Sequence, residues 1–366
     1  MPKFYEIFGF KASEINSELI LEAKSATCPF TGGLCDGGGN RHQTKITLSP
    51  DHALRKHFDD KLGSIVPAVC SIDYGSDQWV VCPRRLMGFK NDAPTPPPLN
   101  HFLQDHEKDV LIKAGLKPGV EYGVWSEIYL QYEIDETEID YHFDFIIAPI
   151  LRNIPLKDLA RQYGATTEEI HELERSAKTG KHLIGPINDR LIATAPDLAN
   201  PIIIEVMTAS TSGSNTATGT NIASAFKSLL LGIDYQGPGI NKRQVWGRMA
   251  TQLFAKSAMA EFWGGKTFWL VQDQLLKNIE LTTKLSTSNL QDNHGETINF
   301  IAMKYQKTGP STRPRIEVDR MAILKSGISF SGSGNCSDIL LPKILPPKLW
   351  LLKCMLRRNI SALIKL

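Results

Sequence analysis

Two acidic residues lie in apolar segments, where an unpaired carboxylate is unfavourable. Glu205 ends the apolar run PIII, and Asp144 lies in the alternating segment YHFDF. Buried charges need partners. Two carboxylates that converge on one Mg²⁺ are typical of metal-dependent phosphodiester cleavage, since the ion lowers the pKa of a bound water and neutralises charge on the phosphate. The alternatives are a buried salt bridge for Glu205 and a surface-facing strand residue for Asp144.

A third catalytic group is expected two residues after the second carboxylate. Residues i and i+2 of a strand face the same side, so a Lys, Glu or Gln there would position the attacking water. Met207 occupies that place, and a thioether cannot orient a water. Lys227 or Thr208 then carries the role, or the metal supplies the activation by itself, or the protein is inactive. Glu127 in WSEIYL is a further candidate carboxylate, whose alternative is an ordinary solvated residue.

Four cysteines in the first part of the chain form a second candidate site: Cys28, Cys35, Cys70 and Cys82. Prolines directly after Cys28 and Cys82 would stiffen two of the ligand turns. Four thiolates around one ion leave no position for a substrate, so this metal site would be structural. Zinc and a single iron ion suit it equally well. The alternative is that the four cysteines are small buried apolar residues.

The candidate contacts for a DNA backbone carry basic or hydroxyl groups. They are Lys242 and Arg243 at the start of a predicted long helix, Arg248 within that helix, Lys227 on the preceding predicted helix, and the hydroxyl-rich stretch from Thr208 to Thr220. Hydroxyls and backbone N–H groups donate to phosphate oxygens. For each basic residue, a solvated surface charge is the alternative.

An α/β sheet is expected to position these residues. The apolar pattern predicts strands over 140–149, 201–208 and 266–272, and helices over 101–116, 222–231 and 244–262. Alternating helices and apolar strands indicate an α/β core. The segment 121–134 fits either a strand or the end of a helix. Residues 154–180 have the residue spacing of a helix-turn-helix. However, four glutamates on the second helix would be repelled by DNA phosphates. This favours a plain helical insertion over a DNA-reading motif.

A proline-rich segment over 90–102 is a plausible linker between two regions. It separates an N-terminal metal-binding domain, residues 1–95, from a core over 96–330. A basic C-terminal tail follows over 331–366. Its end, KLWLLKCMLRRNISALIKL, predicts a basic amphipathic helix that docks on its own protein or on a twin subunit. A membrane-surface or DNA-binding role is the alternative for this helix.

The overall composition excludes some classes of protein. The chain of 366 residues has a formal net charge of only +2, so a DNA-binding surface would be a local patch. Because no run of about 18 apolar residues occurs, no membrane span is expected. Glu6 and Glu14 interrupt the apolar positions of the N-terminus, unlike a signal peptide, and we expect a cytoplasmic protein. Without an export signal, metal ligation is favoured over disulfides for the six cysteines.

Together, these motifs resemble the NotI type of restriction endonuclease. The matching elements are Thr27 to Phe30 (TCPF), Cys35, Val69 and Cys70, Asp77 to Pro83 (DQWVVCP), Phe143 to Phe145 (FDF) and Glu205 to Thr208 (EVMT). The resemblance extends patchily over residues 1–280. It implies a PD-(D/E)XK nuclease fold, with a mixed sheet flanked by helices. It also implies a small N-terminal domain in which the four cysteines hold iron or zinc.

The resemblance also implies a homodimer that cuts double-stranded DNA. Such a type II enzyme uses Mg²⁺ to hydrolyse both strands at a palindrome and leaves 5′-phosphate ends. Asp144 and Glu205 match the metal-binding carboxylates, and Glu127 matches an additional active-site glutamate. NotI-type enzymes have glutamine where this chain has Met207. The alternative function is a catalytically degenerate, metal-stabilised protein that binds a specific DNA sequence.

Overall fold

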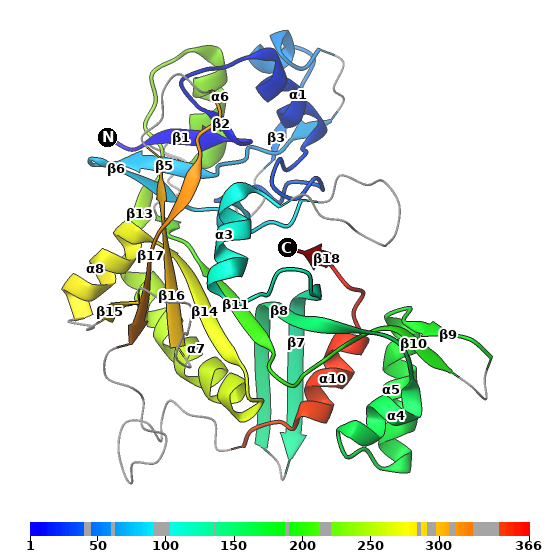
Figure 1. The fold of residues 1–366 in the computed structure, drawn as a ribbon. Coiled ribbons are helices and arrows are strands. Elements are labelled where there is room, and N and C mark those ends of the chain that lie inside the picture. The colour runs from blue at the N-terminus through cyan, green and yellow to red at the C-terminus, as the bar shows by residue number, and fades with distance from the viewer. Residues whose placement is uncertain are drawn as a thin grey trace.

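The computed structural model describes residues 1–39, 45–59, 63–90, 103–134, 137–186, 190–212, 221–283, 287–290, 298–306, 312–324 and 344–366. Its centre is a mixed sheet in which ten strands of these ranges take part (Figure 1). The expected α/β architecture, a large mixed sheet flanked by helices, is therefore confirmed.

The strands of the large sheet follow the order β15-β17-β16-β14-β11-β8-β10-β9, and β8 also pairs with β7, which pairs with β18. Their bounds are β15 (Thr287–Leu290), β17 (Ile316–Leu324), β16 (Ile298–Tyr305), β14 (Lys266–Gln272), β11 (Ile202–Met207), β8 (Thr137–Pro155), β10 (Leu191–Pro196), β9 (Leu183–Ile184), β7 (Glu121–Ile134) and β18 (Ala362–Lys365). Strands β11, β14 and β16 are parallel, whereas β7, β8 and β11 are antiparallel neighbours.

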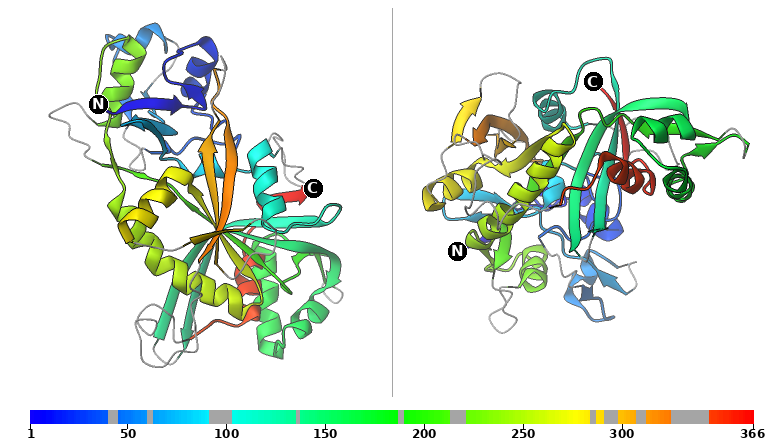
Figure 2. Two further views of the ribbon diagram at one scale, coloured as in Figure 1. Left: turned by 60° about the vertical axis from the view of Figure 1, so that its left-hand side comes forward. Right: turned by 90° about the horizontal axis from the view of Figure 1, so that it is seen from below.

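Helices cover both faces of this sheet. They are α3 (Asp105–Lys113) on one face and α7 (Arg243–Phe262) with α8 (Asp273–Thr283) on the other (Figure 2). The alternation of β11 divides its side chains between these faces, since Ile204 and Val206 pack in the cluster with α3, and Ile203 packs with residues of α7. Glu205 therefore points toward α7.

Most elements predicted from the apolar pattern are present. The strand predicted over 266–272 is β14, and the helix predicted over 222–231 is α6 (Ile222–Leu231). The ambiguous segment 121–134 is the strand β7, which forms a long hairpin with β8. Two short helices, α4 (Leu156–Gln162) and α5 (Thr167–Thr179), form the helical insertion.

The N-terminal region is joined to the large sheet by a continuous core. It contains a smaller sheet of order β2-β1-β5-β6, with β1 (Lys3–Ile7), β2 (Phe10–Lys11), β5 (Ser71–Tyr74) and β6 (Asp77–Val80), together with α1 (Ser17–Ser25) and α2 (Pro83–Leu86). One apolar cluster includes Phe8 of this region, Phe226 of α6 and Trp269 of β14. The backbone N–H of Val80 also donates to Gln272 Oε1 at 2.9 Å. All but the first residue of the predicted linker lies outside the described residues.

The C-terminal segment packs against the same protein. Helix α10 (Lys348–Leu356) contacts α5 and β7, and β18 adds an edge strand to β7. Docking of this segment on its own chain is therefore confirmed. The prediction of one helix to the end of the chain is wrong, because Ala362, Leu363 and Ile364 are buried in an edge strand. Residues 331–343 of the predicted tail lie outside the described ranges. No helix of the described chain is long and apolar enough to cross a membrane.

Candidate functional site

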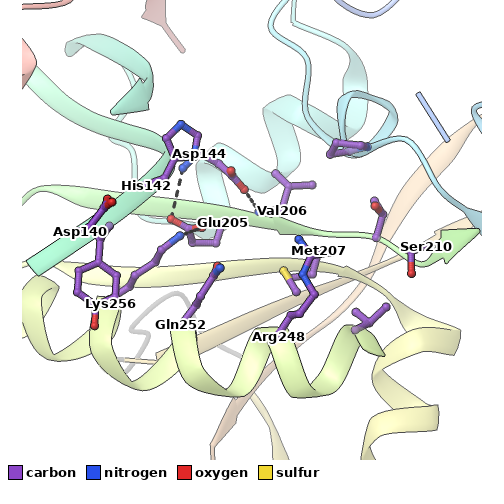
Figure 3. Close-up of a pocket in the computed structure, with 14 residues that line it drawn as sticks. Asp140, His142, Asp144, Glu205, Val206, Met207, Ser210, Arg248, Gln252 and Lys256 are labelled. Atoms are coloured by element: carbon purple, nitrogen blue, oxygen red, sulfur yellow. Dashed lines mark hydrogen bonds and ion pairs between the residues drawn. The ribbon is translucent and has the colours of Figure 1, made fainter. Parts of the chain in front are cut away.

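The two carboxylates selected from the sequence lie side by side on neighbouring strands. Strands β8 and β11 pair up to Phe145 and Ile204, so Asp144 and Glu205 are the next residues in register. Directly opposed residues of an antiparallel pair point to the same face. The backbone N–H of Asp144 donates to Glu205 Oε1 at 3.4 Å, and that of Val206 donates to Asp144 Oδ2 at 2.8 Å (Figure 3). The structure therefore places the two acidic residues next to each other, and both line one pocket.

Lys256 of helix α7 is the third member of the site, and the sequence analysis did not select it. Its Nζ lies 2.5 Å from Glu205 Oε2, and both side chains are only 2% exposed. The ammonium group also lies 5.4 Å from the centre of the Phe143 ring. The available signal was a lysine within the apolar helical stretch LFAKSAMA, where a buried charge needs an acidic partner.

Burial controls the protonation of Glu205. Removal from water raises the pKa of its carboxyl to about 8, while the ammonium of Lys256 opposes this shift and the nearby Asp144 adds to it. A divalent cation beside this carboxyl would favour its charged form and release a proton. The site therefore accepts a cation more readily as the pH rises toward this value.

A pocket of about 500 Å³ opens over these three residues. Its walls come from β8, the end of β11, helix α7 and the first residue of α2, Pro83. Arg248, Gln252 and Lys256 are spaced four residues apart along α7, so they lie on one face of that helix and line the pocket (Figure 3). Met207 also lines it, at the place where a water-positioning side chain was expected.

Glu127 lies at the edge of the site and does not line the pocket. Its backbone has a φ of 54°, which is unusual for a residue other than glycine. Its Oε2 lies 2.7 Å from Nε2 of His142, and both side chains are largely exposed. His142 itself lines the pocket. Glu127 therefore contacts a residue that lines the pocket, His142, and is not itself part of the carboxylate pair.

The predicted DNA contacts are divided between the pocket and other surfaces. Arg248 and Thr208 line the pocket, whereas Lys227 does not. Lys227 lies on α6 near His52, where burial first and the charge of Lys227 second lower the pKa of His52. The amino group of Lys242 stacks 4.1 Å from the centre of the Trp79 ring. The side chain of Arg243 lies outside the described part of the structure.

The four N-terminal cysteines gather in one small cluster. Cys28, Cys70 and Cys82 are buried around Phe30, and Cys35 packs against them. All four are free thiols. Burial raises the pKa of Cys35 to about 12, and it raises the pKa values of Cys70 and Cys82 further. In the absence of a bound cation, burial therefore favours the protonated form of these three thiols.

A close backbone approach shapes this cluster at Gly38. A Cβ on this glycine would lie 2.4 Å from the backbone oxygen of Val69 and 3.2 Å from Sγ of Cys82, and its φ is +56°. Only glycine accommodates this conformation and contact without strain. Among the described residues, no group of three or more His, Cys, Asp or Glu side chains is arranged to hold a metal ion.

The chemistry of the carboxylate pair fits a hard divalent cation. Mg²⁺ prefers oxygen ligands and is commonly held by one or two carboxylates. Asp144 Oδ2 accepts a backbone hydrogen bond from Val206, and the half-buried side chain of Asp144 lines the pocket beside Glu205. No model of a known protein family matches this sequence. No curated protein matches it significantly.

Proposed function

We propose that the protein is a type II restriction endonuclease with a PD-(D/E)XK core, which hydrolyses double-stranded DNA with Mg²⁺. The observation that carries the proposal is the convergence of Asp144, Glu205 and Lys256 in one pocket. Two carboxylates can hold the metal ion that phosphodiester cleavage uses, and a lysine beside them can orient the water or the phosphate. The mixed sheet flanked by helices agrees with the fold that this class implies.

The three side chains have separate roles in this proposal. Asp144 and Glu205 would hold Mg²⁺, which when bound activates a water and neutralises charge that develops on the phosphate. Lys256 holds Glu205 in place and presents an ammonium group to the reacting phosphate. The ammonium group of Lys256 donates hydrogen bonds, whereas the thioether of Met207 donates none. Lys256 therefore fills the role of a group that orients the water or the phosphate. Because this group comes from helix α7, the strand position two residues after Glu205 can hold an apolar side chain.

Symmetric cleavage of both DNA strands requires two copies of this site. A homodimer with a two-fold axis matches a palindromic target, and we propose this assembly for the protein.

The structural role of the N-terminal region would be to hold iron or zinc through Cys28, Cys35, Cys70 and Cys82. Since Pro83 follows Cys82 directly and lines the pocket, an ion there would stiffen one wall of the active site.

Digestion of phage DNA tests the proposal. With Mg²⁺, the wild-type protein should give discrete fragments that end in 5′-phosphates, while Asp144→Ala and Glu205→Ala should give none. Glu133→Ala, an exposed position on the same β7–β8 hairpin, should cut as the wild type does. Intact DNA with every substrate would overturn the proposal. Sequence-dependent mobility shifts without cutting would instead identify the non-catalytic DNA-binding protein, and a smear would identify a nuclease without sequence specificity.

A further inference from the structure

We propose that Gln252 of helix α7 is a further catalytic residue, whose carboxamide oxygen accepts a hydrogen bond from the attacking water. The inference rests on the proposed nuclease function and deepens it, because it names the group that orients the nucleophile. It also divides two roles between neighbouring turns of α7, since Lys256 then serves the phosphate and Gln252 serves the water.

The side chain of Gln252 lies between those of Arg248 and Lys256 in the pocket. The three residues are four positions apart, so each is displaced from the next by about 6 Å along the helix axis. Figure 3 shows Gln252 rising from α7 toward the strand that carries Glu205. Gln252 is exposed, and within the described ranges its carboxamide has no hydrogen-bond partner. The carboxamide is therefore available to a molecule that enters the pocket.

The helix wall of the pocket needs an acceptor if it is to hold the attacking water. A water that attacks phosphorus directs a lone pair at that atom, so its hydrogens point toward acceptors. Arg248 and Lys256 carry only donors, whereas the oxygen of a carboxamide accepts. Val245, the remaining α7 residue that lines the pocket, is apolar. Among the described residues of this wall, Gln252 is thus the one whose side chain can accept from the water.

Two polar residues on the β8 wall of the pocket already have partners. Asp140 accepts a hydrogen bond from the hydroxyl of Tyr129. His142 Nε2 lies 2.7 Å from Glu127 Oε2. Either side chain would have to give up part of its present contact to serve a water, whereas Gln252 would not. The comparison therefore favours the helix wall as the source of the water-orienting group.

The surroundings of Lys256 suit a phosphate better than the attacking water. Its Nζ lies 2.5 Å from Glu205 Oε2, and both side chains are 2% exposed. An ammonium group that binds a water receives the lone pair of that water, which is the pair needed at phosphorus. Phosphate oxygens are acceptors and have no such conflict. The remaining hydrogens of Lys256 are therefore assigned to the phosphate.

The assignment also accounts for Met207. Met207 and Gln252 both line the pocket, one from the end of β11 and the other from α7. Figure 3 shows the sulfur of Met207 close to the α7 side chains in this view. A carboxamide can orient the attacking water in phosphoryl-transfer reactions. Because the helix supplies that carboxamide, the strand does not need one, and exchange of the two side chains becomes a test.

Gln252 takes no proton in this reaction. The oxygen of the water forms the new bond to phosphorus, and the bond between phosphorus and the 3′ oxygen breaks with its electron pair left on that oxygen. The water gives one proton to solvent, and the 3′ oxygen takes one from solvent. The carboxamide accepts only a hydrogen bond, so its contribution is the orientation of the reacting atom.

Replacement of the carboxamide separates cleavage from DNA binding. Gln252→Met keeps the length of the side chain and removes its acceptor, so the single-turnover rate of DNA cleavage with Mg²⁺ should fall about a hundredfold. The affinity for the same duplex with Ca²⁺ in place of Mg²⁺ should stay unchanged, and so should urea unfolding, because the side chain is exposed. Gln162→Met, the same change at an exposed position of α4, is the matched control and should leave all three measurements unchanged.

Transfer of the carboxamide to the strand gives a second measurement. Gln252→Met combined with Met207→Gln should cleave at least about tenfold faster than Gln252→Met alone, because a carboxamide again faces the water. Met207→Gln alone should cleave as the wild type does. A structural role for Gln252 predicts no such recovery.

Three results would overturn the role of Gln252 while the nuclease function stands. One is a wild-type cleavage rate in Gln252→Met. The second is an affinity for DNA that falls by the same factor as the rate, since Gln252 would then be a DNA contact only. The third is an equal rate in the single and the double variant. If the wild-type protein cleaves no duplex, the nuclease function itself fails, and the role of Gln252 falls with it.

Discussion

The buried ion pair between Glu205 and Lys256 is the most consequential contact at the scale of single residues. Each side chain is 2% exposed, so each depends on the other to compensate for lost hydration. Such pairs are often no more stabilising than a hydrophobic substitute, yet breaking one leaves a buried charge without a partner. The pair is therefore better explained by a role in the pocket than by a contribution to stability.

Removal of one partner from this pair is expected to be costly. Above about pH 8, where the carboxyl of Glu205 is charged, Lys256→Met should lower the free energy of unfolding by about 3–5 kcal/mol, because it leaves that charge buried without a partner. Lys256→Met combined with Glu205→Gln should recover much of that loss, since the charge is then removed as well. Urea unfolding of the metal-free proteins measures both values. Strictly additive effects would show that the two side chains are not coupled.

The protonation of Glu205 predicts a pH dependence of stability. Burial raises its pKa from 4.5 to about 8 in the folded protein. Between these values the folded state holds a proton that the unfolded state has lost, so the free energy of unfolding falls as the pH rises through this window. Urea unfolding in EDTA between pH 5 and pH 8 measures the slope. Glu205→Gln should flatten it, and an equal slope in that variant would contradict the assignment.

At the scale of elements, the register between β8 and β11 brings the carboxylates together. Strand β11 is an apolar run with a single acidic residue, and Asp144 lies in the alternating segment YHFDF of β8, so both strands could be predicted from the sequence. Lys256 could not be assigned in the same way, because the rotation of α7 over the sheet depends on packing between distant segments. The placement of Glu127 depends on a backbone with positive φ, which has no signature in an otherwise regular β pattern.

The edge strand at the C-terminus, β18, is the element for which the prediction from the sequence differs most from the structure. Its residues continue a helical apolar pattern, but pairing with β7 covers an open sheet edge and outweighs that local preference. Ile364→Ala should lower the free energy of unfolding by about 2–5 kcal/mol, because the side chain is 3% exposed. The exposed neighbour provides the control: Lys365→Ala should change stability by less than about 0.5 kcal/mol. Equal effects, seen by urea unfolding, would mean that the strand does not dock.

At the scale of the whole molecule, the cysteine cluster and the pocket are parts of one structure. Val80, two residues before Cys82, accepts a hydrogen bond from the backbone N–H of Ala209 at 3.1 Å, beyond the end of β11. The N-terminal region therefore contacts the chain directly after the strand that carries Glu205. The sequence predicted a cysteine cluster from composition and spacing, but the shared core depends on long-range packing that no local pattern encodes.

The proposed metal site at the four cysteines predicts a definite metal content of the purified protein. Elemental analysis of the purified protein should find about one iron or zinc ion per chain. Cys70→Ser should lose that ion, whereas Cys354→Ser, on α10, should keep it. Acidification should release the ion, because the buried thiols hold their protons tightly. A metal-free wild-type protein that folds normally would show that the cysteines are core residues.

The claim on which the account depends is that Asp144 and Glu205 share one divalent cation, and Mn²⁺ binding followed by electron paramagnetic resonance tests it most directly. The wild-type protein should bind an ion at this pair, while Asp144→Asn and Glu205→Gln should each abolish binding at that site, and Glu133→Gln should leave it unchanged. If both single variants bind Mn²⁺ with the affinity and spectrum of the wild type, the two carboxylates do not form a metal site and the proposed catalytic centre is wrong.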